Sequence, residues 1–576
     1  MSNQTTVADH KYVIGPQLWG YNLGFNMTGT TDTQEIFIRQ YHTALESGLT
    51  LDQFADFLEI LPSSVIRKQN RLKQNFGLVL QPLPTDNGGI EIEMPSTWDN
   101  EELLKTHKKV DWDLPVGSKL VITSAQNATP VNKPFLKTIL SYCKKNNARL
   151  VVIPYRYKNP TSIFHNSDQG AEWWDKAIEP YLCQDAIRVC DGLQIIGPLK
   201  VQPTATNPLS GLDTITGLDS AIIGHPKVQL LTVPTPSQQL PKIMTTTGAV
   251  TAPDYTDSKA GYKGEFHHSY AAVIVEVDSD EFHIRHIHSS DDGSFYDLEW
   301  HYEGSKKKRT TISGLVTGDS HVEFMDDNVR AATYDNVDSI VNLLKPEVLV
   351  YHDVEDFYRR NHHHKNDHLL AYGKHHFGRD NVEEGLQLTA DFIDVNSRDW
   401  MTNVIVKSNH DEALDRWLKE ADPKTDPENS RLYYYLMYNL LKSVESTDTG
   451  YSWEDPFKFW CTNPDKLGGL KNTQSTKFLH RDESYTISNI EVGFHGDKGP
   501  NGSRGSPKSF AKIGPKTVVG HSHSPSICDS CYTVGLSAKL NLEYVSGPSS
   551  WMQTHCIIYP DGKRTLINIL NGKWRL

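Results

Sequence analysis

Side chains that commonly bind metals follow five apolar segments in the C-terminal half of the chain. Each segment reads as a strand and ends in Asp, His or Asn: 312–317 precedes Asp319 and His321, 348–351 precedes Asp353 and Asp356, 404–407 precedes Asn409 and His410, 490–494 precedes His495, and 517–519 precedes His521 and His523. Buried strands that stop in such residues deliver them to one edge of a sheet. Imidazole and oxygen donors together suit Mn²⁺, Fe or Zn²⁺ better than Mg²⁺.

The spacing inside two of these segments gives a second expectation. Asp319 and His321 are separated by one residue, and so are His521 and His523. Alternate residues of an extended segment point to the same side. We therefore expect both members of each pair to face one metal site.

Taken in order, the motifs Asp-x-His, Asp-x-x-Asp, Asn-His-Asp, His and Gly-His-x-His resemble those of the calcineurin-like metallophosphoesterase superfamily, over residues 310 to 530. His352 and Ser408 stand where the superfamily usually has glycine. The resemblance implies a site for two divalent cations, with Mn²⁺ favoured and Fe, Zn²⁺ or Mg²⁺ as alternatives. It implies that Asp319, His321 and His523 bind one metal and that Asn409, His495 and His521 bind the other. Asp353 would bridge the two metals.

The same resemblance implies a catalytic pair. His410 matches the superfamily's histidine that binds no metal and protonates the leaving oxygen, and Asp356 matches the carboxylate that orients it. Paired cations lower the pKa of water held between them, and an imidazole is partly cationic near pH 7. The expected activity is hydrolysis of a phosphoester bond.

Residues 1–95 are expected to form a helical module. Apolar periodicity predicts helices over 33–45, over 50–60 and from residue 63, the last two arranged like a helix-turn-helix. The final helix carries four basic residues that would face DNA phosphates if it docks on a duplex: Arg67, Lys68, Arg71 and Lys73. Basic helical hairpins are also common in modules that bind no DNA. The net charge of −13 confines any DNA contact to a local patch.

Three further clusters have competing interpretations. Arg359 and Arg360 follow the second motif and could contact nucleic-acid phosphates, whereas the histidine run 362–364 reads as a solvated loop. The tyrosine-rich segment 432–441 reads as core or subunit packing rather than as a platform for bases. Cys528 and Cys531 read as plain thiols rather than as half of a zinc site.

The expected fold class is α/β (α+β), and the resemblance implies a four-layer β-sandwich flanked by helices for residues 310–576. Residues 96–309 run from α/β to β-rich, and either extend that sandwich or build an oligomer. The chain has 576 residues, no apolar segment long enough to cross a bilayer, and seven scattered cysteines, a combination typical of a cytoplasmic protein. Whether it forms a homo-oligomer is left open.

Three functions fit these observations. The first is a nuclease that cuts DNA at the metal site, since the overall arrangement resembles the pre-early host-DNA-degradation nucleases of large tailed bacteriophages. That resemblance implies a DNase that favours Mn²⁺ and acts on DNA in the cytoplasm of an infected bacterium. The second is a phosphomonoesterase acting on phosphoproteins or nucleotides. The third is a DNA-binding regulator with a relict site, which the complete ligand set disfavours.

Overall fold

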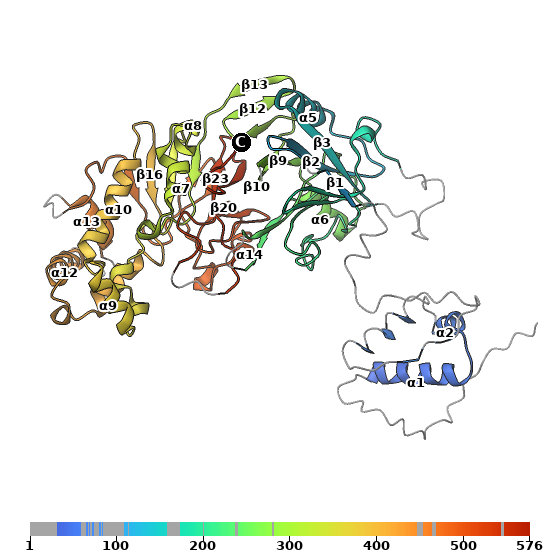
Figure 1. Ribbon diagram of the computed structural model, residues 1–576, viewed down its shortest axis with the longest axis horizontal. Coiled ribbons are helices and arrows are strands. Elements are labelled where there is room, and N and C mark those ends of the chain that lie inside the picture. The colour runs from blue at the N-terminus through green and yellow to red at the C-terminus, as the bar shows by residue number, and fades with distance from the viewer. Residues whose placement is uncertain are drawn as a thin grey trace, which may run out of the picture. The chain divides into compact units, whose positions relative to one another are not determined.

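The computed structural model describes residues 32–58, 65–66, 68–69, 72–73, 80–81, 83, 109–112, 114–157, 173–199, 201–236, 240–278, 281–445, 453–463, 468–542 and 547–576. It divides into two compact units, residues 1–98 and 99–576 (Figure 1). None of the described helices is both long and apolar enough to cross a membrane.

The first unit is helical in its described part. It contains α1 (Asp32–Glu46) and α2 (Leu51–Phe57), and the described residues from 65 to 73 are helical as well. Phe37, Tyr41 and Phe54 form its core, against which Val65 and Leu72 are buried. Tyr41 and Phe54 meet edge to face at 5.4 Å, a geometry that aromatic rings prefer. The two described helices match the expected ones to within a few residues.

The described part of the second unit contains four sheets. The longest has eleven strands, which lie side by side in the order β1 (Lys109–Asp111), β4 (Ala186–Cys190), β5 (Leu193–Ile196), β6 (Ser220–Ile223), β8 (Lys242–Thr246), β7 (Leu230–Val233), β21 (Ser526–Cys528), β22 (Cys531–Thr533), β20 (Lys516–Val519), β19 (Ile490–Glu491) and β18 (Thr486–Ile487). A six-stranded sheet runs β17 (Thr476–Phe478), β16 (Thr402–Ile405), β15 (Val348–Tyr351), β14 (Gly314–Val316), β23 (Thr554–Ile558) and β24 (Arg564–Asn568).

The two smaller sheets belong to the middle of the chain. One runs β10 (Glu281–His288), β9 (Ala271–Asp278), β2 (Lys119–Gln126) and β3 (Ala148–Tyr155), and the other runs β11 (Phe295–Asp297), β12 (Trp300–Glu303) and β13 (Lys306–Arg309). The middle region also contributes to the longest sheet, because Ile527 in β21 pairs with Leu230 in β7. Residues 96–309 therefore share a sheet with residues 310–576.

The described helices of the second unit are α5 (Lys133–Asn146), α6 (Lys259–His267), α7 (Asp327–Arg330), α8 (Ile340–Leu344), α9 (His368–His376), α10 (Val382–Asn396), α11 (Glu412–Glu420), α12 (Ser430–Glu445), α13 (Pro456–Thr462) and α14 (Pro507–Phe510). Local signals explain where several begin: Asn132 accepts a hydrogen bond from Phe135 N ahead of α5, and Asn381 accepts one from Glu384 N ahead of α10. Tyr433 of α12 is buried in the core, as expected, while Tyr434 and Tyr438 are exposed.

Two apolar layers hold the C-terminal sheets in place. Val316, Val350 and Val404 of the six-stranded sheet pack against Ile490 and Val518 of the longest sheet. On the opposite face, the six-stranded sheet packs against α8, α10, α11, α12 and α13 (Figure 1). The expectation of a mixed α/β chain with stacked sheets is confirmed. Since β14 to β17 are parallel, the segments that follow their carboxyl ends share one edge.

Candidate metal centre

The predicted ligands come from two sheets. Asp319, Asp353 and Asn409 follow β14, β15 and β16 of the six-stranded sheet. His495 follows β19 and His521 follows β20 of the longest sheet. The apolar layer between the sheets therefore sets the separation of the two halves of the site.

Four of these residues form a tight, fully buried group. Asp319, His321, Asp353 and His523 offer ligand atoms that all lie within 4.8 Å of one another. His523 Nε2 lies 3.0 Å from Asp319 Oδ2 and 3.1 Å from His321 Nε2. Two ring nitrogens this close can share a proton between them or bind one cation together, and a divalent cation is a partner that both nitrogens and the carboxylates could bind.

Asp353 links this group to the remaining histidines. Its Oδ2 lies 3.6 Å from His321 Nε2 and 3.3 Å from His495 Nε2. The His495 ring in turn lies 5.3 Å from the His521 ring, centroid to centroid. One carboxylate thus contacts both halves of the predicted ligand set.

Many buried polar atoms here lack a hydrogen-bond partner among the residues that the structure describes. They are Asp319 Oδ1, Asp353 Oδ1, Asn409 Oδ1, His495 Nδ1 and His523 Nδ1. A buried polar atom without a partner costs about 1–3 kcal/mol, so such a concentration needs an external partner. Two carboxylates, one amide oxygen and several imidazoles fit divalent cations well.

Charged neighbours within the cluster shift the pKa values of its histidines and carboxylates. Burial by itself would lower the pKa of His495, but the carboxylates of Asp353, Asp319 and Asp497 together outweigh burial and raise that pKa to about 8. Burial likewise opposes ionisation of Asp353, yet His495 and His410 hold its pKa well below the usual range. The cluster therefore keeps its carboxylates charged and available to a cation.

The backbone around the ligands corrects one expectation. His321, His521 and His523 have φ values of 40°, 69° and 55°, and Asp353 has 44°. These residues are left-handed, so the Asp-x-His and His-x-His pairs do not face the site by the alternation of an extended strand. The strands end before these residues, and the left-handed backbone conformation, which is unfavourable for residues other than glycine, then orients these four side chains.

Gly520 explains why the last motif begins with glycine. A Cβ atom at this position would lie 2.2 Å from Asp319 Oδ1 and 3.2 Å from His352 Cβ. The Asp319 carboxylate is also held by the backbone N–H of His521, at 2.7 Å. The absent side chain therefore leaves the space that this carboxylate occupies.

The predicted catalytic pair is in contact. Asp356 Oδ1 lies 3.0 Å from His410 Nδ1 and 2.6 Å from His321 Nδ1, so one oxygen serves both rings. Burial opposes protonation of His410, but Asp353 and Asp356 overcome this and raise its pKa to about 10. A cationic His410 can donate a proton to a leaving oxygen.

Two features of the site were not anticipated from the sequence. Asp411 joins the second and third motifs: it accepts hydrogen bonds from Glu355 N at 3.0 Å and from Ser408 N at 2.9 Å. His352 is fully buried 5.6 Å from the His495 ring, and neither of its ring nitrogens has a hydrogen-bond partner within the described part of the chain. Asp411 ends the Asn-His-Asp motif and His352 stands directly before Asp353, which is the signal that could have drawn attention to them.

The predicted nucleic-acid contacts of the second unit are paired with carboxylates. Arg359 is paired with Glu323 at 3.1 Å and Glu384 at 3.0 Å, and Arg360 binds Asp426 through two nitrogens at 2.7 and 3.0 Å. These ion pairs count against free phosphate contacts by either arginine. In the first unit Lys68 and Lys73 are exposed, whereas Arg67 and Arg71 lie outside the described residues.

The cysteine pair is built into a sheet. Cys528 and Cys531 face each other across β21 and β22, and both are free thiols. Neither belongs to the potential metal-binding groups found among the described residues. The interpretation as plain thiols agrees with this arrangement.

Comparison with known proteins places the chain in a family. It is 36% identical over 477 residues to a protein of Escherichia phage T5 called Protein A1, an alignment that covers 80% of this chain and 84% of the relative. The chain belongs to the Protein A1 family. This membership links it to bacteriophages, as the sequence led us to expect, but the name Protein A1 states no activity. No family model matches the chain, and no solved structure matches it.

Proposed function

We propose that this protein is a metal-dependent phosphodiesterase that cleaves DNA. The observation that carries the proposal is the position of Asp353, whose carboxylate lies between His321 and His495 while its Oδ1 lacks a hydrogen-bond partner among the described residues. A carboxylate flanked in this way is suited to bridge two cations. The ordered resemblance to calcineurin-like metallophosphoesterases leads to the same reaction class.

The proposed cofactor is a pair of divalent cations, with Mn²⁺ favoured by the mixed nitrogen and oxygen donors. Asp319, His321 and His523 would hold one cation, Asn409, His495 and His521 the other, and Asp353 both. Such a pair supplies charge neutralisation on the phosphate and activates water for in-line attack. The protein's own part is to keep these donors rigid, through the two packed sheets and the left-handed turns.

His410, oriented by Asp356, is proposed to protonate the leaving group. His410 holds a proton on its imidazole, and Asp356 fixes the ring through the 3.0 Å contact at Nδ1. Nε2 is then the atom that donates to the departing oxygen. Because Asp356 also contacts His321, movement of the acid is coupled to the position of a metal ligand.

DNA is the favoured substrate for two reasons. The first unit presents the exposed Lys68 and Lys73 on its helical module, and basic helical faces suit phosphate contacts. Membership of a family that includes a bacteriophage protein also fits DNA cleavage in the cytoplasm of an infected bacterium. A DNA-binding regulator without catalysis is disfavoured by the intact ligand cluster.

A phosphomonoesterase remains the alternative. The Asp356–His410 contact suits it as well, because the alkoxide that leaves a monoester needs a proton donor just as the one that leaves a diester does. Such an enzyme would have no evident use for the basic helical module. A substrate comparison therefore separates the two functions.

The deciding experiment incubates the purified protein and Mn²⁺ with linear duplex DNA and, separately, with p-nitrophenyl phosphate. Each reaction is repeated after chelation with EDTA and after Mn²⁺ is restored. Loss of DNA that chelation stops and Mn²⁺ restores supports the proposal. Turnover of the monoester alone would replace it with the phosphatase function.

A further inference from the structure

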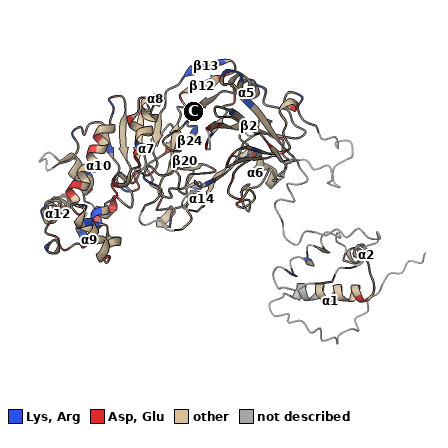
Figure 2. Cartoon of the chain, in the orientation of Figure 1, with Lys and Arg blue, Asp and Glu red and all other residues tan. Residues whose placement is uncertain are grey.

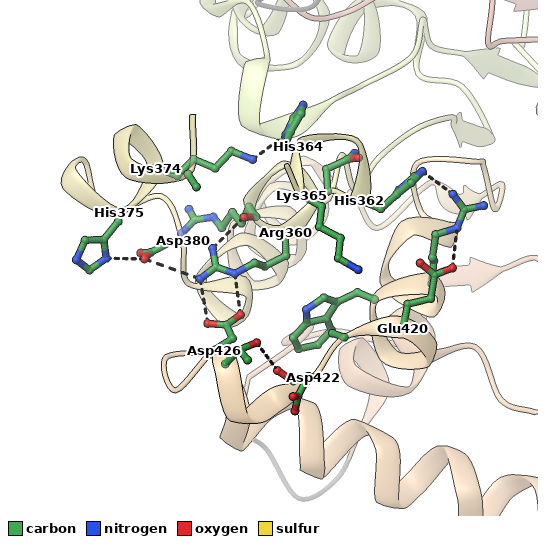
Figure 3. Close-up of a pocket in the computed structure, with 17 residues that line it drawn as sticks. Arg360, His362, His364, Lys365, Lys374, His375, Asp380, Glu420, Asp422 and Asp426 are labelled. Atoms are coloured by element: carbon green, nitrogen blue, oxygen red, sulfur yellow. Dashed lines mark hydrogen bonds and ion pairs between the residues drawn. The ribbon is translucent and has the colours of Figure 1, made fainter. Parts of the chain in front are cut away.

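A pocket of about 490 Å³ lies among α9, α11 and the segments 358–365 and 421–426 (Figure 3). Its volume falls within the 300–1,000 Å³ range of sites for small organic ligands. Lysine, arginine, aspartate and glutamate gather near α9 and α10 (Figure 2). The proposed function makes no use of this pocket.

The pocket is continuous with the metal-binding loops. The lining starts at Arg359, three residues after Asp356, and α11, which begins two residues after His410, contributes Arg416, Trp417 and Glu420. Arg359 contacts Glu323, which lies two residues beyond His321. Since α11 advances about 1.5 Å per residue, its first turns lie close to the candidate acid. A bound molecule here would be a near neighbour of a phosphate at the metal centre.

Most charges in the pocket are already paired. Arg360 is fixed by Asp426, His375 contacts Asp380 at 2.8 Å, and Arg416 contacts His362 (Figure 3). Lys365 differs, because no carboxylate among the described residues pairs with its ammonium group, which extends into the pocket (Figure 3). Among the described residues that line the pocket, Lys365 is therefore the cationic side chain that a ligand could pair with, and its neighbours are held by ion pairs and hydrogen bonds.

The rest of the lining is amphipathic. Trp417, with 8% of its surface exposed, Ala371 and Ala421 provide apolar surface, and Glu420 and Asp422 provide carboxylates. Glu420 is paired with Arg416 at 3.9 Å, and Asp422 accepts a hydrogen bond from Lys424 N at 3.1 Å. An inorganic anion would not use the apolar surface, and an apolar ligand would leave Lys365 unpaired. A molecule with an anionic group and a flat ring would use both.

We propose that this pocket binds a nucleotide, with its phosphate at Lys365 and its base against the surface formed by Trp417 and Ala421. The ligand is either one unit of the DNA strand held at the metal centre or a free deoxynucleoside monophosphate. The assignment to a DNA strand rests on the proposed function. The binding of a nucleotide as such does not.

The test measures binding by titration calorimetry in EDTA, so that no cleavage occurs. The probes are deoxyadenosine 5′-monophosphate, inorganic phosphate and a single-stranded decanucleotide. Lys365→Glu should weaken nucleotide binding about tenfold or more through loss of a phosphate contact. Ala371→Trp should weaken it without changing charge, by filling the pocket. Lys442→Glu, an exposed lysine on α12, is the matched control and should bind like the unmodified protein.

Each outcome has a defined meaning. Equal nucleotide affinity in Lys365→Glu and Lys442→Glu, or inorganic phosphate binding as tightly as the nucleotide, overturns the proposal. If both the mononucleotide and the decanucleotide lose affinity in Lys365→Glu, the pocket holds a unit of the strand. If only the mononucleotide does, the ligand is the free monophosphate. Failure of the Mn²⁺-loaded protein to cut DNA, with nucleotide binding intact, would refute the proposed function and leave the pocket assignment standing.

Discussion

The candidate metal centre and the pocket beside α9 are both rich in histidine, yet they are built differently. In the centre, His321, His495 and His523 are buried, and neighbouring carboxylate oxygens lack protein partners in the described structure. In the pocket, the side chain of His375 is 78% exposed and pairs with Asp380. Histidine content alone therefore does not indicate a metal site, whereas buried donors without partners mark a candidate one.

Asp353→Ala is expected to give the largest effect and tests the first half of this contrast. It removes the one carboxylate that contacts both His321 and His495. Mn²⁺ content by elemental analysis should fall to background, and DNA cleavage should fall further than the roughly 10–100-fold typical of losing a ligand's outer partner. His362→Ala in the pocket is the control and should retain full Mn²⁺. Full metal content in Asp353→Ala would contradict the bridging role.

His410→Ala separates proton transfer from metal binding. His410 contacts Asp356 but is not assigned as a ligand, so the variant should keep its Mn²⁺. Turnover of DNA should fall by about 10²–10⁴-fold, the usual contribution of a general acid. The measurement is kcat together with metal content on the same preparation. Unchanged kcat would remove His410 from the proposed reaction.

Gly520→Ala tests how closely the centre is packed. The added Cβ would lie 2.2 Å from Asp319 Oδ1, so the carboxylate or the loop must move. Mn²⁺ affinity should fall about 10–100-fold, as when the support of a ligand is lost. Gly373→Ala is the matched control, since a Cβ there meets nothing within 4 Å. If both variants bind Mn²⁺ equally, the space at Gly520 is not needed for the site.

The sequence predicted where the ligands would gather, because a strand that ends in Asp, His or Asn is a local pattern. It did not predict how they are aimed, since the left-handed conformations of Asp353 and His523 depend on the loops around them. The partners of Arg359 were also hidden, because Glu323 and Glu384 lie 36 and 25 residues away in the chain. The pairing of β7 with β21 spans nearly 300 residues, so no local pattern could indicate that the middle region shares a sheet with the C-terminal half.

The pH dependence of metal binding sharpens the contrast further. His495 must lose its proton to bind a cation, and the carboxylates of Asp353, Asp319 and Asp497 together raise its pKa to about 8 in the metal-free protein. Mn²⁺ affinity should therefore drop about tenfold per pH unit below pH 8 and level off above it, provided one proton is released. The free energy of unfolding of the metal-free protein has the opposite pH dependence, because protonated His495 stabilises the fold. This contribution is complete below pH 6.5 and is lost as the pH rises through about 8. Mn²⁺ affinity that is flat from pH 6 to 9 would rule out this coupling.

The smallest expected effect concerns the first unit. Lys73 is exposed on the helical module, so Lys73→Glu should remove one phosphate contact and lower the slope of log affinity against log salt by about one. Affinity for duplex DNA in EDTA should fall several-fold, while Mn²⁺ content and turnover of a small phosphodiester stay unchanged. The control is Lys471→Glu, an exposed lysine of the second unit. If the two variants have identical salt-dependent binding curves, the helical module does not hold DNA, and the metal centre must recruit its substrate through the second unit alone.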